Sequence, residues 1–364
     1  MTIESDFQYA PEAVKDEFLD LVSEASVRIP KQSWKHFTPT FLDTESQKFD
    51  TDEAMEIVTA RQKIYREERI AQMEGTVAIH SEMPVTVFMI GDIHWGSIFT
   101  NNELWEKHRK ALLATPGAYV MFLHNLVDNG MPGKFPNNIL TNGVPPDIQF
   151  KVMQKWIKGL DEKGKVLGAI EGDCHEGWSW QVAGVSASNL IYGFGGRKFP
   201  VLDNGGIIHL SVNDQLYNIG LWHKAGPFNS RFNPEHALRQ NRRLHHESQT
   251  DIEVGAHYHN TVASSSYEGG PSHLKPVQWL RVGAYKGVPS FEGDTDYTTD
   301  KWSIDKFGTS GQPPAPSVML WENQHRTDSS LDFDTGLEKH MAIRSYALLK
   351  KMGLADKLEG LFKK

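Results

Sequence analysis

The chain has 364 residues, a formal net charge of −8 and a single cysteine. This length can bury a large core and predicts two domains or one large domain with additions. The negative charge argues against a protein that coats nucleic acid through a general positive field, although it leaves room for a local basic patch. Cys174 alone excludes an internal disulfide and a thiolate zinc cluster, which leaves histidine and carboxylate as metal ligands.

Two features bear on the compartment. The sequence has no apolar stretch of about eighteen residues, and its first residues lack the basic-then-apolar layout of a signal peptide. We therefore expect a cytoplasmic protein that does not bind membranes. The sequence gives no basis for an oligomeric state.

The first part of the chain is helical in pattern. Apolar residues recur at helical spacing within 11–28, and a second helix is expected over 52–73 after the cap signals Asp50 and Thr51. We predict a helical N-terminal extension over residues 1–80 and a main domain over residues 81–364.

From residue 84 onward, strands alternate with helices. The pattern predicts strands at 85–90, 118–123 and 165–170 and helices at 102–114 and 147–163. After Pro200 the chain is rich in strands, predicted at 206–212, 215–222, 251–254, 261–266, 277–282 and 318–321. Two further helices are expected at 234–246 and 337–352, and a long surface loop at 293–316. An α/β (α+β) fold follows from this order.

Five segments follow predicted strands and carry side chains of the kind that bind metals. They are Gly91-Asp92-Ile93-His94, His124-Asn125 with Asp128, Glu171-Gly172-Asp173-Cys174-His175, Trp222-His223 and His257-Tyr258-His259. Ligands of open α/β sheets gather outside the carboxyl ends of the strands, so five such ends can converge on one crevice. Singly, each segment also fits a turn carboxylate or an ordinary histidine, but the ordered set indicates a metal site.

This ordered set resembles the calcineurin-like metallophosphoesterase superfamily. The family pattern is Gly-Asp-x-His, Gly-Asp-x-x-Asp, Gly-Asn-His-Asp/Glu, a lone His and Gly-His-x-His, and the resemblance covers about residues 84–290. It implies a four-layer sandwich of two facing mixed β-sheets flanked by helices, with the metal crevice at one end. The helical N-terminal extension would be added to that sandwich.

The resemblance also implies a dinuclear centre. Two divalent ions would be held, the first by Asp92, His94 and His259, and the second by Asp173, His223 and His257, with Asn125 at the place of the bridging aspartate. Two ions of this kind clamp the attacking water and the phosphoryl oxygens. Manganese is our first choice, with iron, zinc or magnesium as alternatives, since mixed nitrogen and oxygen ligands do not select one of them.

Two motifs depart from the family pattern. Asn125 is an amide where a bridging carboxylate is expected, which should weaken at least one metal site. Asp173 is a carboxylate where the family has asparagine, so the ligand charge is conserved across the pair. Cys174 is an extra residue before His175. The resemblance assigns protonation of the leaving group to His175, with Cys174 as the alternative occupant, although a thiol is a poor acid near neutral pH.

Other polar residues near the motifs have two interpretations each. Asp128 matches the second aspartate of the family, which orients the site, and it equally fits a turn cap. Arg231 and Lys224 place positive charge beside His223, and a guanidinium fork matches phosphate oxygens, so Arg231 is our candidate for phosphate binding.

Two further groups of side chains are expected to serve the fold. The solvated face of a helix is preferred for Arg242 and Arg243 over a phosphate-binding wall. The tryptophans beside the motifs could stack a nucleobase, but packing of the ligand loops is the preferred role for Trp95, Trp178, Trp180 and Trp222.

These observations predict a metal-dependent phosphoesterase. It would hydrolyse a phosphate ester, either a phosphodiester of the nuclease type or a phosphomonoester, with a metal-activated hydroxide as the nucleophile. The substrate would be a phosphate ester such as a nucleotide or nucleic acid. The alternative is a degenerate family member that acts as a metal- or nucleotide-binding module with little turnover, for which Asn125 is the best indication.

Overall fold

The computed structural model describes most of the chain from residue 73 onward. The described residues are 52, 55–60, 62, 73–130, 142–171, 179, 187–193, 196–224, 233–245, 249–269, 274–286, 314–352 and 354. The helix predicted at 11–28 and most of the loop predicted at 293–316 lie outside them. Among the described residues, no helix is long and apolar enough to cross a bilayer.

Two six-stranded mixed sheets form the body of the molecule. The first sheet, in the order β1-β6-β7-β8-β10-β9, comprises β1 (Glu74–Ile79), β6 (Gly205–Val212), β7 (Gln215–Trp222), β8 (Ile252–Gly255), β10 (Lys275–Arg281) and β9 (Val262–Glu268). The second sheet, in the order β12-β11-β2-β3-β4-β5, comprises β12 (Thr327–Ser330), β11 (Ser317–Leu320), β2 (Val85–Ile90), β3 (Ala118–Leu123), β4 (Val166–Glu171) and β5 (Val201–Asp203).

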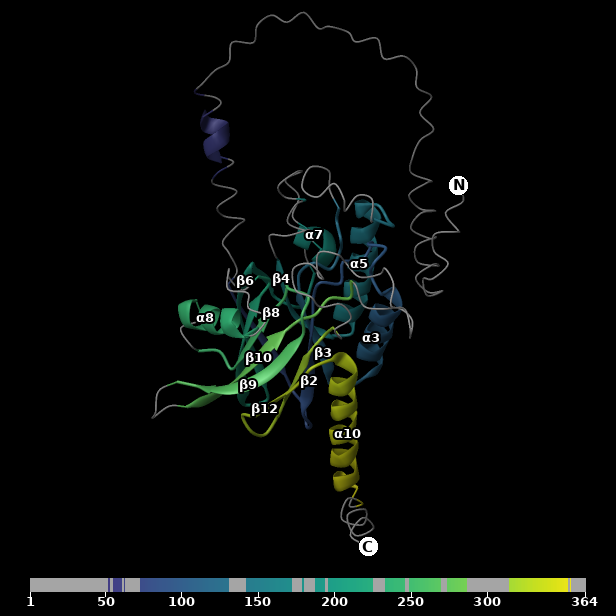
Figure 1. The fold of residues 1–364 in the computed structure, drawn as a ribbon, viewed down its shortest axis with the longest axis vertical. Helices are drawn as coiled ribbons and strands as arrows, with labels where there is room; N and C mark the ends of the chain where they lie inside the picture. The colour runs from purple at the N-terminus through teal and green to yellow at the C-terminus, as the bar shows by residue number, and fades with distance from the viewer. Residues whose placement is uncertain are drawn as a thin grey trace, which may run out of the picture.

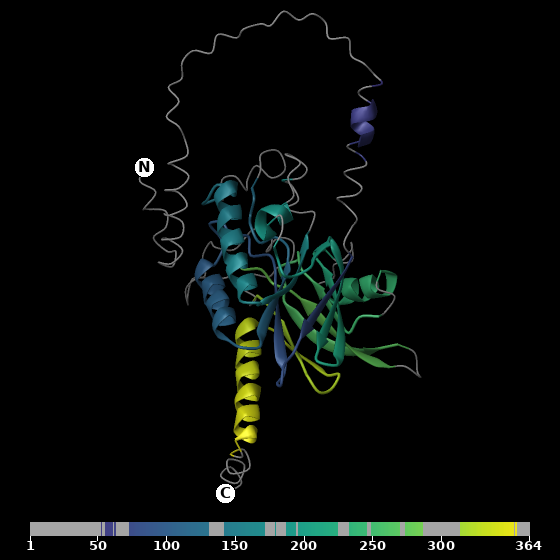
Figure 2. The ribbon, with the colours of Figure 1, turned by 180° about the vertical axis from the view of Figure 1, so that it is seen from behind.

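Helices cover the outer faces of both sheets. α3 (Asn102–Ala114), α5 (Pro146–Glu162) and the start of α10 (Phe333–Lys351) pack against the second sheet, and α8 (His236–Leu244) covers the first. Figures 1 and 2 show α8 and α3 on opposite sides of the two sheets. A short helix, α7 (Ala187–Tyr192), lies against α5. The predicted four-layer α/β sandwich is therefore confirmed.

Strand β2 shows why its sequence is apolar on both faces. Val85, Val87 and Met89 enter the core between the two sheets. Phe88 and Ile90 enter the second core, beneath the helices. A strand buried on both faces has no polar alternation, which explains the continuous run Val-Thr-Val-Phe-Met-Ile.

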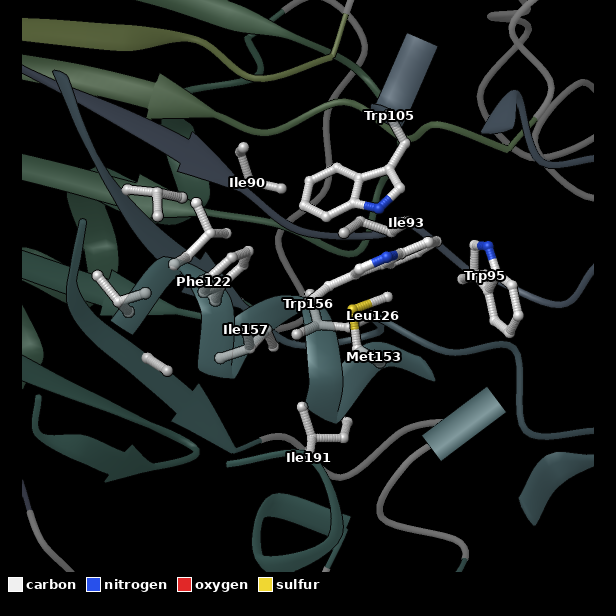
Figure 3. Close-up of a cluster of buried hydrophobic side chains, with 14 of the residues drawn as sticks. Ile90, Ile93, Trp95, Trp105, Phe122, Leu126, Met153, Trp156, Ile157 and Ile191 are labelled. Carbon is white, nitrogen blue, oxygen red and sulfur yellow. The ribbon is translucent and has the colours of Figure 1, made fainter. Parts of the chain in front are cut away.

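The tryptophans of the outer core pack against one another. The Trp95 and Trp156 rings meet edge to face with centroids 5.4 Å apart, and Trp105 lies 6.1 Å from Trp156 (Figure 3). Trp95 is buried, so its predicted role in packing is confirmed. Trp222 packs against the cluster beneath α8, and Trp178 and Trp180 lie outside the described residues.

Most elements fall where the sequence predicts them. The hairpin of β6 and β7 turns at Asn213, whose φ of 50° is the left-handed conformation that asparagine tolerates. α8 begins two residues later than predicted, because Asn233 accepts a backbone hydrogen bond from His236 in a turn that precedes the helix. β1 lies inside the range 1–80 expected to be helical, and it pairs in parallel with β6.

The direction of the strands places the predicted ligands together. β2, β3 and β4 run parallel in the second sheet, and β7, β8 and β10 run parallel in the first. The carboxyl ends of parallel neighbours share an edge of a sheet, so the loops after β2, β3, β7 and β8 meet.

Candidate metal centre

The loops after β2 and β3 are joined through their backbones. The Asp92 amide donates to the His124 carbonyl at 3.1 Å, and the His94 amide donates to the Asn125 carbonyl at 2.9 Å. Gly91 permits this approach, because a Cβ atom there would lie 2.8 Å from the Leu123 carbonyl oxygen. The close passage fixes the positions from which the side chains of both loops project.

Unusual backbone conformations concentrate in these loops. Ten described non-glycine residues have a positive φ, and seven of them belong to the predicted motifs or follow them directly: Asp92, His94, His124, Asn125, Asn129, His257 and His259. Such conformations cost free energy and persist where the surrounding structure enforces them, typically at functional sites. Their concentration here makes these strand ends the candidate functional site.

Asp92, His94 and His259 form a group suited to a metal ion. One ligand atom from each lies within 4.8 Å of the others, and all three residues are buried. The Nε2 atoms of His94 and His259 each lie 3.7 Å from Asp92 Oδ1. Two atoms each about 2.1 Å from one ion are roughly 3.0 to 3.4 Å apart in octahedral or tetrahedral geometry. The group therefore fits a divalent ion after shifts of less than about 1 Å.

The Asp92 carboxylate is fixed through both of its oxygens. Oδ2 accepts a hydrogen bond from the His257 backbone amide at 2.6 Å, which leaves Oδ1 facing the two imidazoles. Burial alone raises the pKa of the Asp92 carboxyl, but its interaction with His94 and the attraction of His259 outweigh burial and lower this pKa well below its usual range. Asp92 is therefore an anion, as a metal ligand must be.

Asp128 orients His94 from the side away from Asp92. Its Oδ1 atom lies 3.1 Å from His94 Nδ1 and 3.0 Å from Lys286 Nζ. A carboxylate only accepts, so Nδ1 carries the proton and Nε2 is left to face Asp92. Burial lowers the pKa of His94, but its hydrogen bond to Asp128 and the nearby Asp92 outweigh burial and raise it. Asp128 thus contacts the predicted ligand His94 through the ring nitrogen that does not face Asp92.

Asn125 lies between Asp92 and His223. Its Nδ2 atom donates to Asp92 Oδ1 at 3.0 Å and lies 3.3 Å from His223 Nε2. On the opposite side of the His223 ring, Nδ1 lies 3.3 Å from the Leu123 carbonyl oxygen. Burial, reinforced by the neighbouring His124 ring, holds the pKa of His223 well below its usual value. His223 is therefore neutral, with its proton on Nδ1.

The remaining predicted residues divide into two groups. The His257 ring lies 5.1 Å from the His223 ring, centroid to centroid, beside the group of three. Asp173, His175 and Arg231 lie outside the described residues, as does Cys174, so their roles remain predictions.

Lys286 is a site residue that sequence reasoning missed. It follows β10 by five positions, and its side chain is nearly buried against Asp128. A lysine in Gly-Ala-Tyr-Lys-Gly carries no motif. Only its position after a strand parallel to β8 could have indicated it.

The arginines of α8 take part in the fold, but the solvated helix face predicted for Arg242 is wrong, because its side chain is buried, whereas that of Arg243 is exposed. The buried Arg242 donates to the Thr250 carbonyl through Nε at 3.1 Å and Nη2 at 2.9 Å. Arg243 pairs with Glu268 at 3.2 Å, and Arg239 also contacts Glu268. These contacts support a structural role for the helix over a phosphate-binding wall.

Comparison with known proteins finds slight similarities of fold. No family model and no curated protein matches the chain. Among solved structures, Vacuolar Protein Sorting 29 from Cryptosporidium parvum is 15% identical with a TM-score of 0.35, over 68% of this chain and 97% of that one. Vps29 complexed with zinc from Entamoeba histolytica is 15% identical with a TM-score of 0.28, over 68% and 99%. A predicted phosphoesterase from Streptococcus pneumoniae is 12% identical with a TM-score of 0.27, over 69% and 100%. At these values the likeness carries no functional argument, so function is argued from the chain's own residues.

Proposed function

We propose that this chain is a metal-dependent phosphoesterase. The observation that carries the proposal is the buried group of Asp92, His94 and His259, whose ligand atoms lie within 4.8 Å of one another at the ends of parallel strands. The order of the motifs along the chain supplies the reaction class, because that order resembles the calcineurin-like metallophosphoesterases. The substrate would be a phosphate ester such as a nucleotide or nucleic acid.

The chain's own residues would prepare the centre before substrate arrives. The His257 amide holds Asp92 with Oδ1 toward the imidazoles, and Asp128 holds His94 with Nε2 toward Asp92. Ligands that are fixed in this way lose little conformational entropy when they bind an ion. A divalent ion bound there would lower the pKa of water and polarise a phosphoryl oxygen.

Two further roles come from the motif order. We assign protonation of the leaving group to His175, and contact with the phosphoryl oxygens to Arg231. Imidazole titrates near neutral pH, as a general acid requires. A guanidinium fork can donate two hydrogen bonds to phosphate. Asp128 is assigned a positioning role, since it contacts His94 and Lys286.

Hydrolysis of aryl phosphates tests the proposal. Bis-p-nitrophenyl phosphate reports diesterase activity and p-nitrophenyl phosphate reports monoesterase activity, each with Mn²⁺, Zn²⁺, Mg²⁺ or a chelator. Single-stranded DNA tests the nuclease form. Because the ion's contribution is worth several kcal/mol, His94→Ala should lower kcat/KM by about 100-fold or more.

His80→Ala is a matched control for that variant. His80 is exposed and directly follows β1, whose last residue pairs with Val212. Val212 in turn pairs with Gln215, the first residue of β7, whereas the site follows the last residue of β7. His80→Ala should therefore leave activity unchanged. Equal activity in wild type and His94→Ala, or activity that survives chelation, would refute the proposal.

A binding module with little turnover is the second candidate, and the contacts of Asn125 favour it. An amide that donates to both Asp92 and His223 occupies the position of the carboxylate expected to bridge two ions. If this candidate is correct, the wild type binds metal and hydrolyses neither ester above the rate of the His94→Ala blank. A large gain of hydrolysis in Asn125→Asp would then favour the degenerate form.

A further inference from the structure

The Asn125 side chain acts as a donor to both of its neighbours. Asp92 Oδ1 is a carboxylate oxygen and can only accept the hydrogen bond at 3.0 Å. His223 Nδ1 faces the Leu123 carbonyl, which also only accepts, so Nδ1 carries the ring proton and Nε2, 3.3 Å from the same Asn125 Nδ2 atom, is the acceptor. Two acceptors require the NH₂ group between them. Rotating the amide by 180° would instead set its oxygen 3.0 Å from a carboxylate oxygen.

That NH₂ group occupies the space a second ion needs. An ion on His223 Nε2 would lie about 2.0–2.1 Å along its lone pair. Asn125 Nδ2 already lies 3.3 Å from Nε2, within hydrogen-bonding distance of the same nitrogen. An ion on this line would be only about 1.2 Å from Nδ2. The hydrogen bond from Asn125 and an ion therefore compete for the same nitrogen of His223.

Charge also opposes a second ion. One dication on Asp92, His94 and His259 leaves a net charge of +1, from +2 for the ion and −1 for the carboxylate. A second dication would raise this to +3, or to +2 if Asp173 adds its carboxylate. The negative charge of Asp128 does not help, because the buried Lys286 ammonium balances it. Uncompensated charge in a buried site is costly.

We infer that this chain binds a single divalent ion, on Asp92, His94 and His259, and that the Asn125 amide replaces the second ion by hydrogen bonding to Asp92 and His223. The inference rests on the proposed metal centre but does not depend on turnover. The Asn125 amide thereby links the loops that follow β2, β3 and β7 through hydrogen bonds. In a dinuclear centre, the second ion would link these loops instead.

Metal binding without substrate tests the inference. The full-length protein is freed of metal, titrated with Mn²⁺ by calorimetry, and analysed for bound metal after dialysis. The double variant His94→Ala/His259→Ala serves as the blank for ions bound elsewhere on the surface. The wild type should bind one equivalent above the blank. Its electron paramagnetic resonance spectrum should show the six lines of an isolated Mn²⁺, without the exchange coupling of a pair.

Two variants test the role of the amide. His223→Ala should still bind one equivalent with an affinity within about threefold of wild type. Asn125→Asp should bind two equivalents and develop an exchange-coupled spectrum. Far-ultraviolet circular dichroism confirms that each variant is folded. If His223→Ala does not fold, the comparison of wild type with Asn125→Asp decides the question.

Each contrary result has a distinct meaning. Two equivalents in the wild type, or loss of the ion in His223→Ala, would overturn the inference and leave the proposed function standing. An Asn125→Asp variant that stays at one equivalent would refute the role given to Asn125. No binding by the wild type would overturn the metal centre and the phosphoesterase proposal together. One equivalent without hydrolysis would support the inference and count against the phosphoesterase.

Discussion

Replacing Asp128 by asparagine removes the carboxylate that contacts both His94 and Lys286. Its Oδ1 atom lies 3.1 Å from His94 Nδ1 and 3.0 Å from Lys286 Nζ, and all three side chains are nearly inaccessible to solvent. The substitution conserves size, so it changes charge and leaves packing intact. It should therefore alter metal affinity through His94 and stability through Lys286.

The two effects have different magnitudes. Loss of a carboxylate behind a metal-binding histidine typically lowers metal affinity by about 10 to 100-fold, which is roughly 1.4 to 2.7 kcal/mol. Removing one partner of a buried ion pair lowers the free energy of unfolding by about 3 to 5 kcal/mol, because the remaining charge is then buried without its partner. Asp128→Asn should therefore weaken Mn²⁺ binding by one to two orders of magnitude and lower the free energy of unfolding by about 3 kcal/mol or more.

Calorimetric titration with Mn²⁺ and chemical denaturation of the metal-free protein measure these effects separately. The double variant Asp128→Asn/Lys286→Met removes both charges, so it should regain most of the lost stability while its Mn²⁺ affinity stays low. Asp161→Asn is a matched control, because this buried carboxylate at the C-terminal end of α5 accepts a hydrogen bond from the Lys198 backbone amide and contacts no predicted ligand. Wild-type affinity in Asp128→Asn would refute the argument that Asp128 orients His94.

Two further predictions concern stability. Gly91→Ala should lower the free energy of unfolding by about 1–3 kcal/mol, because the new methyl group would lie 2.8 Å from a backbone oxygen of β3. Gly159→Ala in α5 should raise it by roughly 0.5–1 kcal/mol, because the new methyl group would have no atom within 4 Å. Equal denaturation midpoints for these two variants would contradict the close approach. Asp251 raises the pKa of His325, so the charged ring contributes stability that is present below about pH 6.5 and is lost as pH rises through the folded-state pKa. The stability difference between wild type and His325→Gln should accordingly shrink between pH 6 and pH 8.5, and a difference that grows with pH would show that the sign is wrong.

Local pattern was sufficient for much of the sandwich. β2, α3, β3 and β7 have the predicted bounds to the residue, because apolar runs or periodicity distinguish them from the turns beside them. β12 was missed because its sequence, Thr-Asp-Ser-Ser, has no apolar alternation and becomes a strand through pairing with β11. β5 has only three residues, and α7 has only six, too few for a periodic signal.

For the candidate site too, some features could be predicted from the sequence and others could not. The sequence by itself determined that Asp92, His94 and His259 directly follow strands, because their motifs are local and their strands are strongly apolar. Only the tertiary structure decided that Asp128 contacts His94, that Lys286 is buried beside it, and that the Asn125 amide donates to Asp92 and His223.

The physical reason is the distance along the chain over which these contacts form. His257 and Asp92 are 165 residues apart when the amide of one donates to the carboxylate of the other. The direction of each side chain depends on loop backbones with positive φ, which are enforced by packing between two sheets and not by local propensity. A sequence pattern can therefore name the ligands, but the contacts among them require the folded chain.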